Sequence, residues 1–406
     1  MARGPELCGV SLMRLTCVAG ILALLFWSER IVVFMNVEQD NIHQEHATQG
    51  AKTILPKYGL TVDSEKNDLP TEAAGTKMRA KKLGKIPVVR ATINSDDANS
   101  EKSVPQKTPK DGYDNLSRAA YYQRRKEKVN PHDFHYIIKE EKFCEKLSEP
   151  PYLLVLICSY HDREYSRLAV RETWGSVSQT QSWVDGRPLK QAVKILFFVG
   201  THIVSSWNKK IAHESQIHSD IILEDYTESP FNASIKTIGA FKWAAAFCPQ
   251  AKYVLKVEED VFIDIPKVLD ILSHSNTMYG ARHAKFSVQR NGQWAVPYSV
   301  FPFETFPPFL GGPAYAMSLD LAKRVYEASE YFPMIVLEDA YVTGVLREVV
   351  GAEIKQFEEF GNWGSRQPSS CEVAHGKVIA GNRLEADDML FLWEDLKDSH
   401  LREKCG

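Results

Sequence analysis

Three consecutive carboxylates, Glu258, Glu259 and Asp260, follow the apolar run KYVLKV, which ends at Val257. Crowded carboxylates repel one another, and each is destabilised when it leaves water, so they need either solvent or a bound cation. Glu258 and Asp260 stand two positions apart on an extended chain and can face the same way, which suits a hard cation held against a phosphate. A solvated loop at the end of a strand is the alternative interpretation.

A second acidic pair, Glu338 and Asp339, lies between an apolar run and a helical segment in YFPMIVLEDAYVTGVLREV. Asp339 is either the N-cap of that helix, a position that favours Asp, or a general base at the mouth of the same cleft. Upstream, FPPFLGGPAYAMS predicts a proline-stiffened loop. Its Gly311 and Gly312 would allow a bulky ligand to approach the backbone closely.

Two arginines, Arg167 and Arg171, are four residues apart in the helical segment SRLAVRETWG. This spacing puts both guanidinium groups on one helical face, where they can reach one anionic ligand. An exposed basic face is the alternative.

Apolar runs without alternation predict the strands that must position these residues. They are PYLLVLICS, VKILFFVG, the end of IAHESQIHSDIILEDY, and KYVLKV. Helical patterns separate them, among them an expected amphipathic helix from about Ser234 to Phe247. This alternation favours a mainly parallel sheet covered on both faces, and therefore an α/β domain. Ligands of such sheets bind beyond the carboxyl ends of the strands, where Glu258, Glu259 and Asp260 stand.

The whole chain has 406 residues, 44% of them hydrophobic, and can bury one large core or two small ones. Its net charge of -3 gives no reason to expect a nucleic-acid partner. The uncharged run from Leu15 to Trp27, preceded by Arg3 and Arg14, favours an uncleaved signal anchor over a cleaved signal peptide. We therefore expect a cytosolic tail over residues 1–14, a signal-anchor transmembrane segment over 15–35, an irregular stem over 36–150 and a lumenal domain over 151–406.

An oxidising compartment permits disulfides, for which Cys144, Cys248, Cys371 and Cys405 are the candidates. Their pairing is left open by the sequence. Cys158 ends an apolar strand and is expected to be a buried free thiol. Asn115 and Asn232 begin the tripeptides NLS and NAS and are candidate N-glycosylation sites.

Six motifs in order resemble the β-1,3-galactosyltransferase family of inverting Golgi enzymes. They are RLAVRETWG, ESQIHSDIILEDYTESPFNASIKT, FKWAAAFCPQAKYVLKVEEDVFID, FPPFLGGPAYAMS, LEDAYVTG and MLFLWEDLKDSHLREKC. The resemblance covers about Tyr152 to Cys405. It implies a GT-A type, nucleotide-sugar-binding α/β domain, anchored as a single-pass type II protein in the Golgi membrane.

The resemblance also implies roles for individual residues. Glu258 and Asp260 would hold Mn²⁺, or Mg²⁺, on the donor diphosphate, and Asp339 would be the base that deprotonates the acceptor hydroxyl. The donor side would include Arg167, Arg171, Asp225, Lys236 and Glu259, and the acceptor side Gly311, Gly312 and Glu338.

Three departures from the family pattern bear on this assignment. Glu258 replaces the first Asp of the family's acidic motif, and Asn382 replaces a His before the closing helix. Leu310 replaces a Cys, so one familiar bridge is missing and its partner is expected to pair with Cys144.

The expected activity is transfer of a sugar from a UDP-sugar to a glycan on protein or lipid, with inversion. Galactose is the sugar that we expect. UDP-N-acetylglucosamine as donor and an inactive, glycan-binding or assisting homologue are the alternatives.

Overall fold

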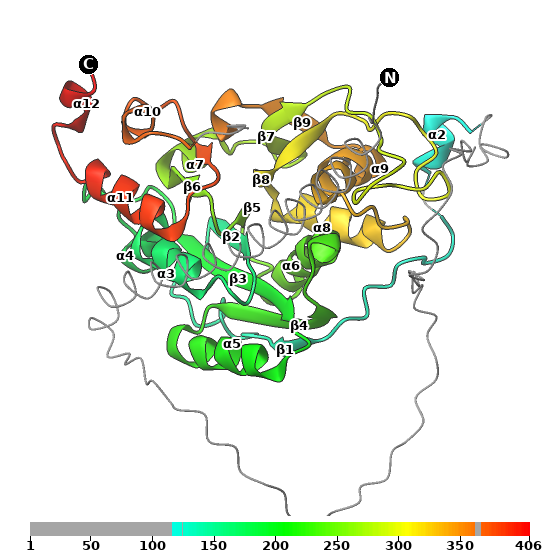
Figure 1. Ribbon diagram of the computed structural model, residues 1–406, viewed down its shortest axis with the longest axis horizontal. Helices are drawn as coiled ribbons and strands as arrows, with labels where there is room; N and C mark the ends of the chain where they lie inside the picture. Colours follow the sequence, from blue (N-terminus) through cyan, green and yellow to red (C-terminus); the bar gives the residue numbers. More distant parts are fainter. Residues whose placement is uncertain (1–115, 124, 362–366) are drawn as a thin grey trace, which may run out of the picture. The chain divides into compact units, whose positions relative to one another are not determined.

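The computed structural model describes residues 116–123, 125–361 and 367–406. In these residues the main sheet has eight strands in the order β1-β4-β3-β2-β5-β8-β7-β9 (Figure 1). Its strands are β1 (Tyr136–Ile138), β2 (Leu153–Cys158), β3 (Val193–Thr201), β4 (Ile221–Thr227), β5 (Tyr253–Glu258), β7 (Thr277–His283), β8 (Phe309–Ser318) and β9 (Glu353–Gln356). A small second sheet pairs β6 (Phe262–Ile263) with β10 (Ala380–Gly381).

The expected parallel sheet is confirmed for the strands β4, β3, β2 and β5, which are all parallel to their neighbours in that group. Beyond β5 the sheet is mixed, because β8 is antiparallel to both β5 and β7, while β9 is parallel to β7. The result is an α/β fold with a mostly parallel centre.

Helices cover both faces of this sheet. The α-helices are α2 (Arg118–Tyr121), α3 (Glu164–Glu172), α4 (Val177–Thr180), α5 (Ser205–His218), α6 (Ala233–Phe247), α7 (Ile265–Ile271), α8 (Leu319–Ser329), α9 (Arg347–Val350), α10 (Ser370–Ala374), α11 (Ala386–Leu396) and α12 (Leu401–Lys404). The other short helices are η1 (Trp174–Ser176), η2 (Pro230–Asn232), η3 (Ala340–Leu346) and η4 (Glu358–Phe360). Figure 1 shows α3 and α11 on one side of the sheet and α6 and α8 on the other.

The packing of strand β2 on both of its faces explains why its sequence does not alternate between apolar and polar residues. Leu154 and Leu156 join one buried hydrophobic cluster with residues of α6 and α8, whereas Leu153, Val155 and Ile157 join a second cluster with residues of α3 and α11. Both faces of the strand are therefore dry, and an apolar side chain is stabilising at every position.

The predicted helix at 234–247 is confirmed as α6, but it is not amphipathic. Most of its side chains are buried, including the polar Ser234, Lys236 and Thr237. The helix lies between β3 and α8, so it has little surface left for solvent.

The segment 306–318, expected to be a loop, forms strand β8 from Phe309 onward. The register between β7 and β8 shifts after the pairs Tyr279–Ala316 and Gly280–Tyr315 and resumes at Arg282–Leu310. The sequence GGP therefore forms a bulge inside the strand, where a proline without an N–H is tolerated.

Residues before 151, which we expected to be stem, are packed against the domain from residue 116 onward. Tyr121 and Cys144 belong to the buried core, and β1 pairs with the edge strand β4. The segment around Tyr136, part of the expected irregular stem, is this strand. The expected tail, anchor and Asn115 lie outside the described residues.

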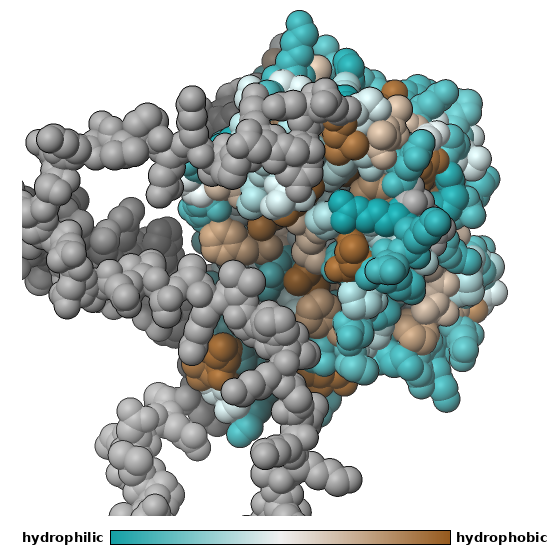
Figure 2. All heavy atoms as spheres, turned by 90° about the vertical axis from the view of Figure 1, so that its right-hand side faces the viewer, coloured by the Kyte–Doolittle hydropathy of each residue, from teal (hydrophilic) through white to brown (hydrophobic). Residues whose placement is uncertain are grey.

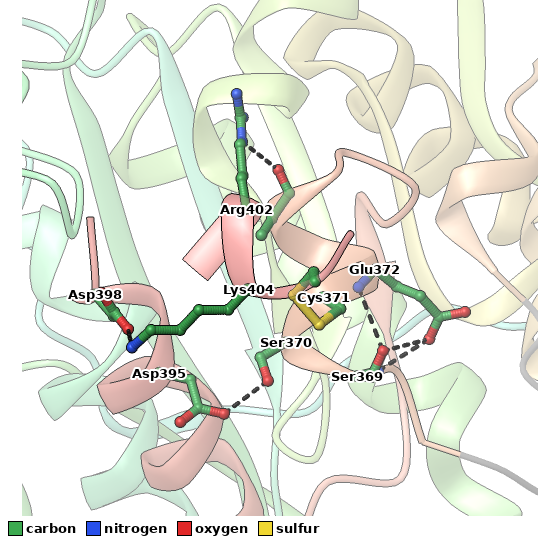
Figure 3. The surroundings of a disulfide bond; sticks show 10 residues. Ser369, Ser370, Cys371, Glu372, Asp395, Asp398, Arg402 and Lys404 are labelled. Carbon is green, nitrogen blue, oxygen red and sulfur yellow. Dashed lines mark hydrogen bonds and ion pairs between the residues drawn. A yellow bond between two sulfur atoms is a disulfide. The ribbon is translucent and has the colours of Figure 1, made fainter. Parts of the chain in front are cut away.

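The four candidate cysteines form two disulfides, Cys144–Cys248 and Cys371–Cys405, and Cys158 is a buried free thiol. Figure 3 shows the second bridge between α10 and the C-terminal end of α12. Around it, Arg402 donates to the carbonyl oxygen of Ala374, and Lys404 pairs with Asp398. The disulfide and these polar contacts together hold the C-terminus.

Contact of the described residues with a membrane would depend on the apolar residues of their surface and on the length and hydropathy of their helices. In Figure 2 hydrophobic residues lie among hydrophilic ones on the face toward the viewer. No helix among the described residues is long and apolar enough to cross a bilayer. The side-chain amide of Asn232 donates to the carbonyl oxygen of Thr227 at 2.7 Å, and its glycosylation stays a prediction.

We predict that the two disulfides stabilise the domain unequally. Cys144–Cys248 spans 104 residues of sequence and Cys371–Cys405 spans 34. Because longer loops lose more entropy when they are closed, removal should lower the free energy of unfolding by about 4.7 and about 3.8 kcal/mol, respectively. Urea unfolding of the two Cys→Ser double variants measures this. A greater loss for Cys371→Ser/Cys405→Ser would contradict the loop-length explanation.

Candidate active site

A cleft of about 220 Å³ opens at the carboxyl ends of β2 and β5. The two strands are parallel, and their register puts Cys158 opposite Glu258. The charged and aromatic residues that line the cleft are Tyr160, Arg163, Lys236, Lys256, Glu258, Glu259, Asp260 and Glu385. The acidic triplet therefore stands at a cleft, as the strand order predicted, and not on a solvated loop.

The three carboxylates of the triplet have different surroundings. The Glu258 side chain is 45% exposed, whereas that of Glu259 is 8% exposed and lies 3.9 Å from the guanidinium of Arg163. Burial raises the pKa of Glu259 to about 7. Burial, followed by repulsion from Glu258, raises the pKa of Asp260 to about 6. Burial is thus the first cause of both shifts, because it disfavours the charged form of a carboxyl group.

No cluster of three or more His, Cys, Asp or Glu side chains among the described residues is arranged to hold a metal ion. Asn382, however, directly follows β10, which pairs with β6 just beyond Asp260. The side-chain carbonyl oxygen of Asn382 is buried and has no hydrogen-bond partner. Two carboxylates and one unpartnered carbonyl oxygen are the ligand types that hard cations prefer. The residues present therefore fit a divalent cation.

Asp339 lies on the other side of β5, next to the bulge in β8. Its Oδ2 accepts a hydrogen bond from the backbone N–H of Gly312 at 3.2 Å, and its Oδ1 accepts from the N–H of Ala340 at 2.8 Å. The N-cap interpretation is thus confirmed, and the same side chain is also fixed beside β8. Burial, and then Glu338, raises the pKa of Asp339 to about 7.

The helix that Asp339 begins, η3, is a π-helix, a form that is often found at functional sites. A carboxyl group with a pKa near neutral at a π-helix start suits a proton acceptor. The arrangement combines a cap with the geometry of a base.

Gly311 and Gly312 face the protein itself. A Cβ on Gly311 would lie 3.0 Å from Nε2 of His283, and a Cβ on Gly312 would lie 3.5 Å from Asp339. The two glycines therefore shape the bulge in β8. Gly312 reaches the site through its backbone, because its N–H holds Asp339.

Glu338 is buried beside Asp339 and points into the sheet. Its Oε1 accepts from the Tyr315 hydroxyl at 2.5 Å, and its Oε2 lies 3.4 Å from Nζ of Lys256. Glu338 is therefore part of a buried polar network under the site.

Arg167 and Arg171 do not reach the cleft, contrary to the donor-binding expectation. Arg167 pairs with Glu214 at 2.5 Å, and its remaining donors bond Ser159 and the carbonyl oxygen of Tyr160. Arg171 pairs with both Glu214 and Asp220 at 2.8 Å. Buried guanidinium groups require such partners, and these pairs tie α3 to α5.

Of the other three donor-side candidates, Lys236 and Glu259 line the cleft and Asp225 does not. Lys236 is buried there. Its Nζ lies 3.0 Å from Glu228 and donates to the carbonyl oxygen of Ser159 at 2.6 Å. Asp225 instead accepts from the backbone N–H of His135 at the sheet edge, because β1 is paired there. The sequence reasoning failed for Asp225 because it did not foresee β1.

Arg163 is a cleft residue that the sequence reasoning missed. Its side chain is 44% exposed and lies 3.4 Å from Glu385. Lys236 and Lys256, the other cationic residues that line the cleft, are 3% and 2% exposed. Arg163 precedes Arg167 by four residues, so the arginine spacing contained the signal, but the cleft residue is the first of the series.

Comparison with known proteins agrees with the motifs. Residues 165–358 match the family model described as Galactosyltransferase. The chain is 32% identical over 282 residues to beta-1,3-galactosyltransferase 1 of Homo sapiens, covering 68% of this chain and 82% of that protein. It is 31% identical over 259 residues to beta-1,3-galactosyltransferase 5 of Mus musculus, covering 62% and 80%.

Among solved structures, the galactosyltransferase LgtC in complex with donor and acceptor sugar analogs gives a TM-score of 0.33. That likeness has 10% identity and covers 60% of this chain and 95% of LgtC. It is too distant to add to the sequence comparison. On the identity and coverage of its sequence relatives, this chain belongs to the β-1,3-galactosyltransferase family.

Proposed function

We propose that the protein is an inverting β-1,3-galactosyltransferase that moves galactose from UDP-galactose to a hydroxyl group of a glycan on protein or lipid. The observation that carries this proposal is the position of Asp339. A carboxyl group with a pKa near 7 is held by the backbone of β8, while the acidic cleft opens at the end of the adjacent strand β5. The proposed base is therefore bonded to the strand next to the one that ends at the donor cleft.

The cleft would bind the UDP diphosphate with Mn²⁺ or Mg²⁺ held by Asp260, Glu258 and Asn382. When bound, the cation neutralises negative charge that develops on the diphosphate leaving group. Arg163 is exposed enough to turn toward the diphosphate, and its guanidinium suits phosphate oxygens. Glu259 is buried beside Arg163 and would orient that guanidinium.

Asp339 would accept the proton of the acceptor hydroxyl. The oxygen then attacks the anomeric carbon from the face opposite UDP, the bond from that carbon to the diphosphate oxygen breaks, and its electron pair leaves with UDP. The proton remains on the carboxyl group of Asp339, and an α-linked donor gives a β-linked product. A carboxylate whose pKa is near the working pH is well suited to this role.

Two alternatives are kept within this family. UDP-N-acetylglucosamine as donor is one. A homologue that binds glycans without transfer is the other, and it is motivated by Glu258 and Asn382, two of the departures from the family pattern that the resemblance implied. Transfer assays with several UDP-sugars, with and without Mn²⁺, distinguish these alternatives.

We also propose the type II Golgi topology, on the apolar run of residues 15–27 and the polar sequence that follows it.

We predict that Asp260→Asn impairs donor binding. The change removes one negative charge at constant size, so UDP affinity should fall in Mn²⁺ and stay the same in EDTA, as measured by calorimetry. Transfer should fall on the order of 10²-fold, as when one group that stabilises developing charge is removed. The control is Asp225→Asn, whose carboxylate pairs with His135 outside the cleft. Equal UDP binding with and without Mn²⁺, together with full transfer by Asp260→Asn, would contradict the cation site.

We predict a different result for Asp339→Asn. The amide keeps the size of the side chain but cannot accept the proton, so transfer should fall by roughly 10²- to 10⁴-fold while UDP binding in Mn²⁺ is unchanged. Single-turnover transfer and UDP calorimetry together measure this. A loss of UDP affinity as large as that in Asp260→Asn would place Asp339 on the donor side and refute its assignment as base.

We predict that transfer by the wild-type protein declines as the pH falls below about 7. The base must be ionised, and the pKa of Asp339 is raised to about 7, so the ionised fraction falls tenfold per pH unit below that value. A pH profile of kcat/KM measures the decline. A profile that stays flat down to pH 5 would exclude Asp339 as the titrating base.

A further inference from the structure

Lys256 is a buried cation in the centre of the sheet, between the donor cleft and Asp339. Only 2% of its side chain is exposed. Its Nζ lies 3.3 Å from Glu258, 3.4 Å from Glu338 and 2.7 Å from the carbonyl oxygen of Gly312. One ammonium group thus contacts the acidic triplet, the residue before the base, and the bulge that holds the base.

We propose that Lys256 is a positioning residue that holds Asp339 in place and keeps it ionised at the pH of transfer, an inference that rests on the proposed role of Asp339 as base. Lys256 lines the donor cleft, but only 2% of its side chain is exposed there. It acts through two intermediates, the backbone of Gly312 and the carboxylate of Glu338.

The first intermediate is mechanical. The carbonyl oxygen of Gly312 accepts from Lys256, and the N–H of Gly312 donates to Oδ2 of Asp339 at 3.2 Å. Gly312 lies in the bulge, where β8 leaves its regular pairing with β7, so the ladder between these strands does not fix it. The bond from Lys256 to Gly312 therefore orients the N–H group that orients the base.

The second intermediate is electrostatic. The charged and titratable groups around Asp339 are Glu338 on its own segment, Lys256 and Glu258 on β5, and Tyr315 on β8. Glu338 and Glu258 raise the pKa of Asp339, and Lys256 lowers it. Lys256 is the cation in this group, so it limits how far Glu338 and Glu258 raise the pKa of Asp339.

Lys256 has carboxylate partners on two sides, because its Nζ lies 3.3 Å from Glu258 and 3.4 Å from Glu338. A buried ammonium group requires such partners. An apolar side chain at this position would leave Glu338 buried with Tyr315 as its remaining partner.

The test is direct titration of Asp339 in the whole chain by carboxyl ¹³C NMR without added metal, with the signal assigned from Asp339→Asn. In Lys256→Met the pKa of Asp339 should rise by about one unit or more, and in Lys256→Arg it should stay near the wild-type value. Glu338→Gln should lower it, and Lys256→Met/Glu338→Gln should return it toward wild type. A pKa that is the same in Lys256→Met and wild type would overturn the proposal.

The double variant also covers the case in which Lys256→Met does not fold. It removes both members of the buried ion pair, and it is compared with Glu338→Gln, in which Lys256 remains. The pKa of Asp339 should be higher in the double variant than in Glu338→Gln. If the two values coincide, Lys256 has no influence on the base and the proposal is wrong.

The transfer assay separates this inference from the proposed function. The acidic limb of the kcat/KM profile should move to higher pH in Lys256→Met, with a loss of about tenfold at pH 6 for one unit of pKa shift. A residue that only stabilised the fold would lower transfer equally at all pH values. If the NMR shift is found but the wild-type protein transfers no sugar, the proposed function fails while the influence of Lys256 on Asp339 stands.

Discussion

A charge removed from water must find an opposite charge or a set of hydrogen bonds, and this constraint organises the carboxyl edge of the sheet. The buried cations there meet it fully. Arg167 and Arg171 share Glu214, Lys236 pairs with Glu228, and Lys256 lies between Glu258 and Glu338. Asp260 and Asp339 differ, because within the described residues neither has a cation at ion-pair distance. These are the two carboxylates to which we assign the cation and the acceptor proton.

The sequence predicted the parallel half of the fold because its signals there are local. A strand that is dry on both faces must be apolar at every position, as Leu153 to Ile157 are, so no knowledge of its neighbours is needed. The antiparallel half has no such signal. In β8 the run GGP is typical of a loop, and it is accommodated as a bulge only because β5 and β7 support the strand from both sides. That support comes from residues 26 to 65 positions away, from the pair His283–Phe309 to the pair Tyr253–Ser318.

The sequence predicted site residues correctly where a motif stands at the end of a strand. It failed where the role of a residue depends on a partner from another element. The acidic triplet follows β5, and its cleft position follows from topology alone. The arginine spacing showed correctly that Arg167 and Arg171 share a helical face. Two like charges on a face do not reveal whether acids from another helix cover them, and Glu214 lies more than 40 residues away. Arg163 escapes that burial because it stands at the N-cap, one turn nearer the strand ends.

The bridge between Cys144 and Cys248 has a topological consequence for proteolysis. It joins a segment that precedes the first parallel strand to the end of α6, so the backbone from 145 to 247 lies inside a covalent loop. A protease that nicked the chain once within this loop would leave the two pieces linked, because the path through the sulfur atoms survives. A cut before residue 116, in contrast, lies upstream of both disulfides and leaves the described pairings in one piece.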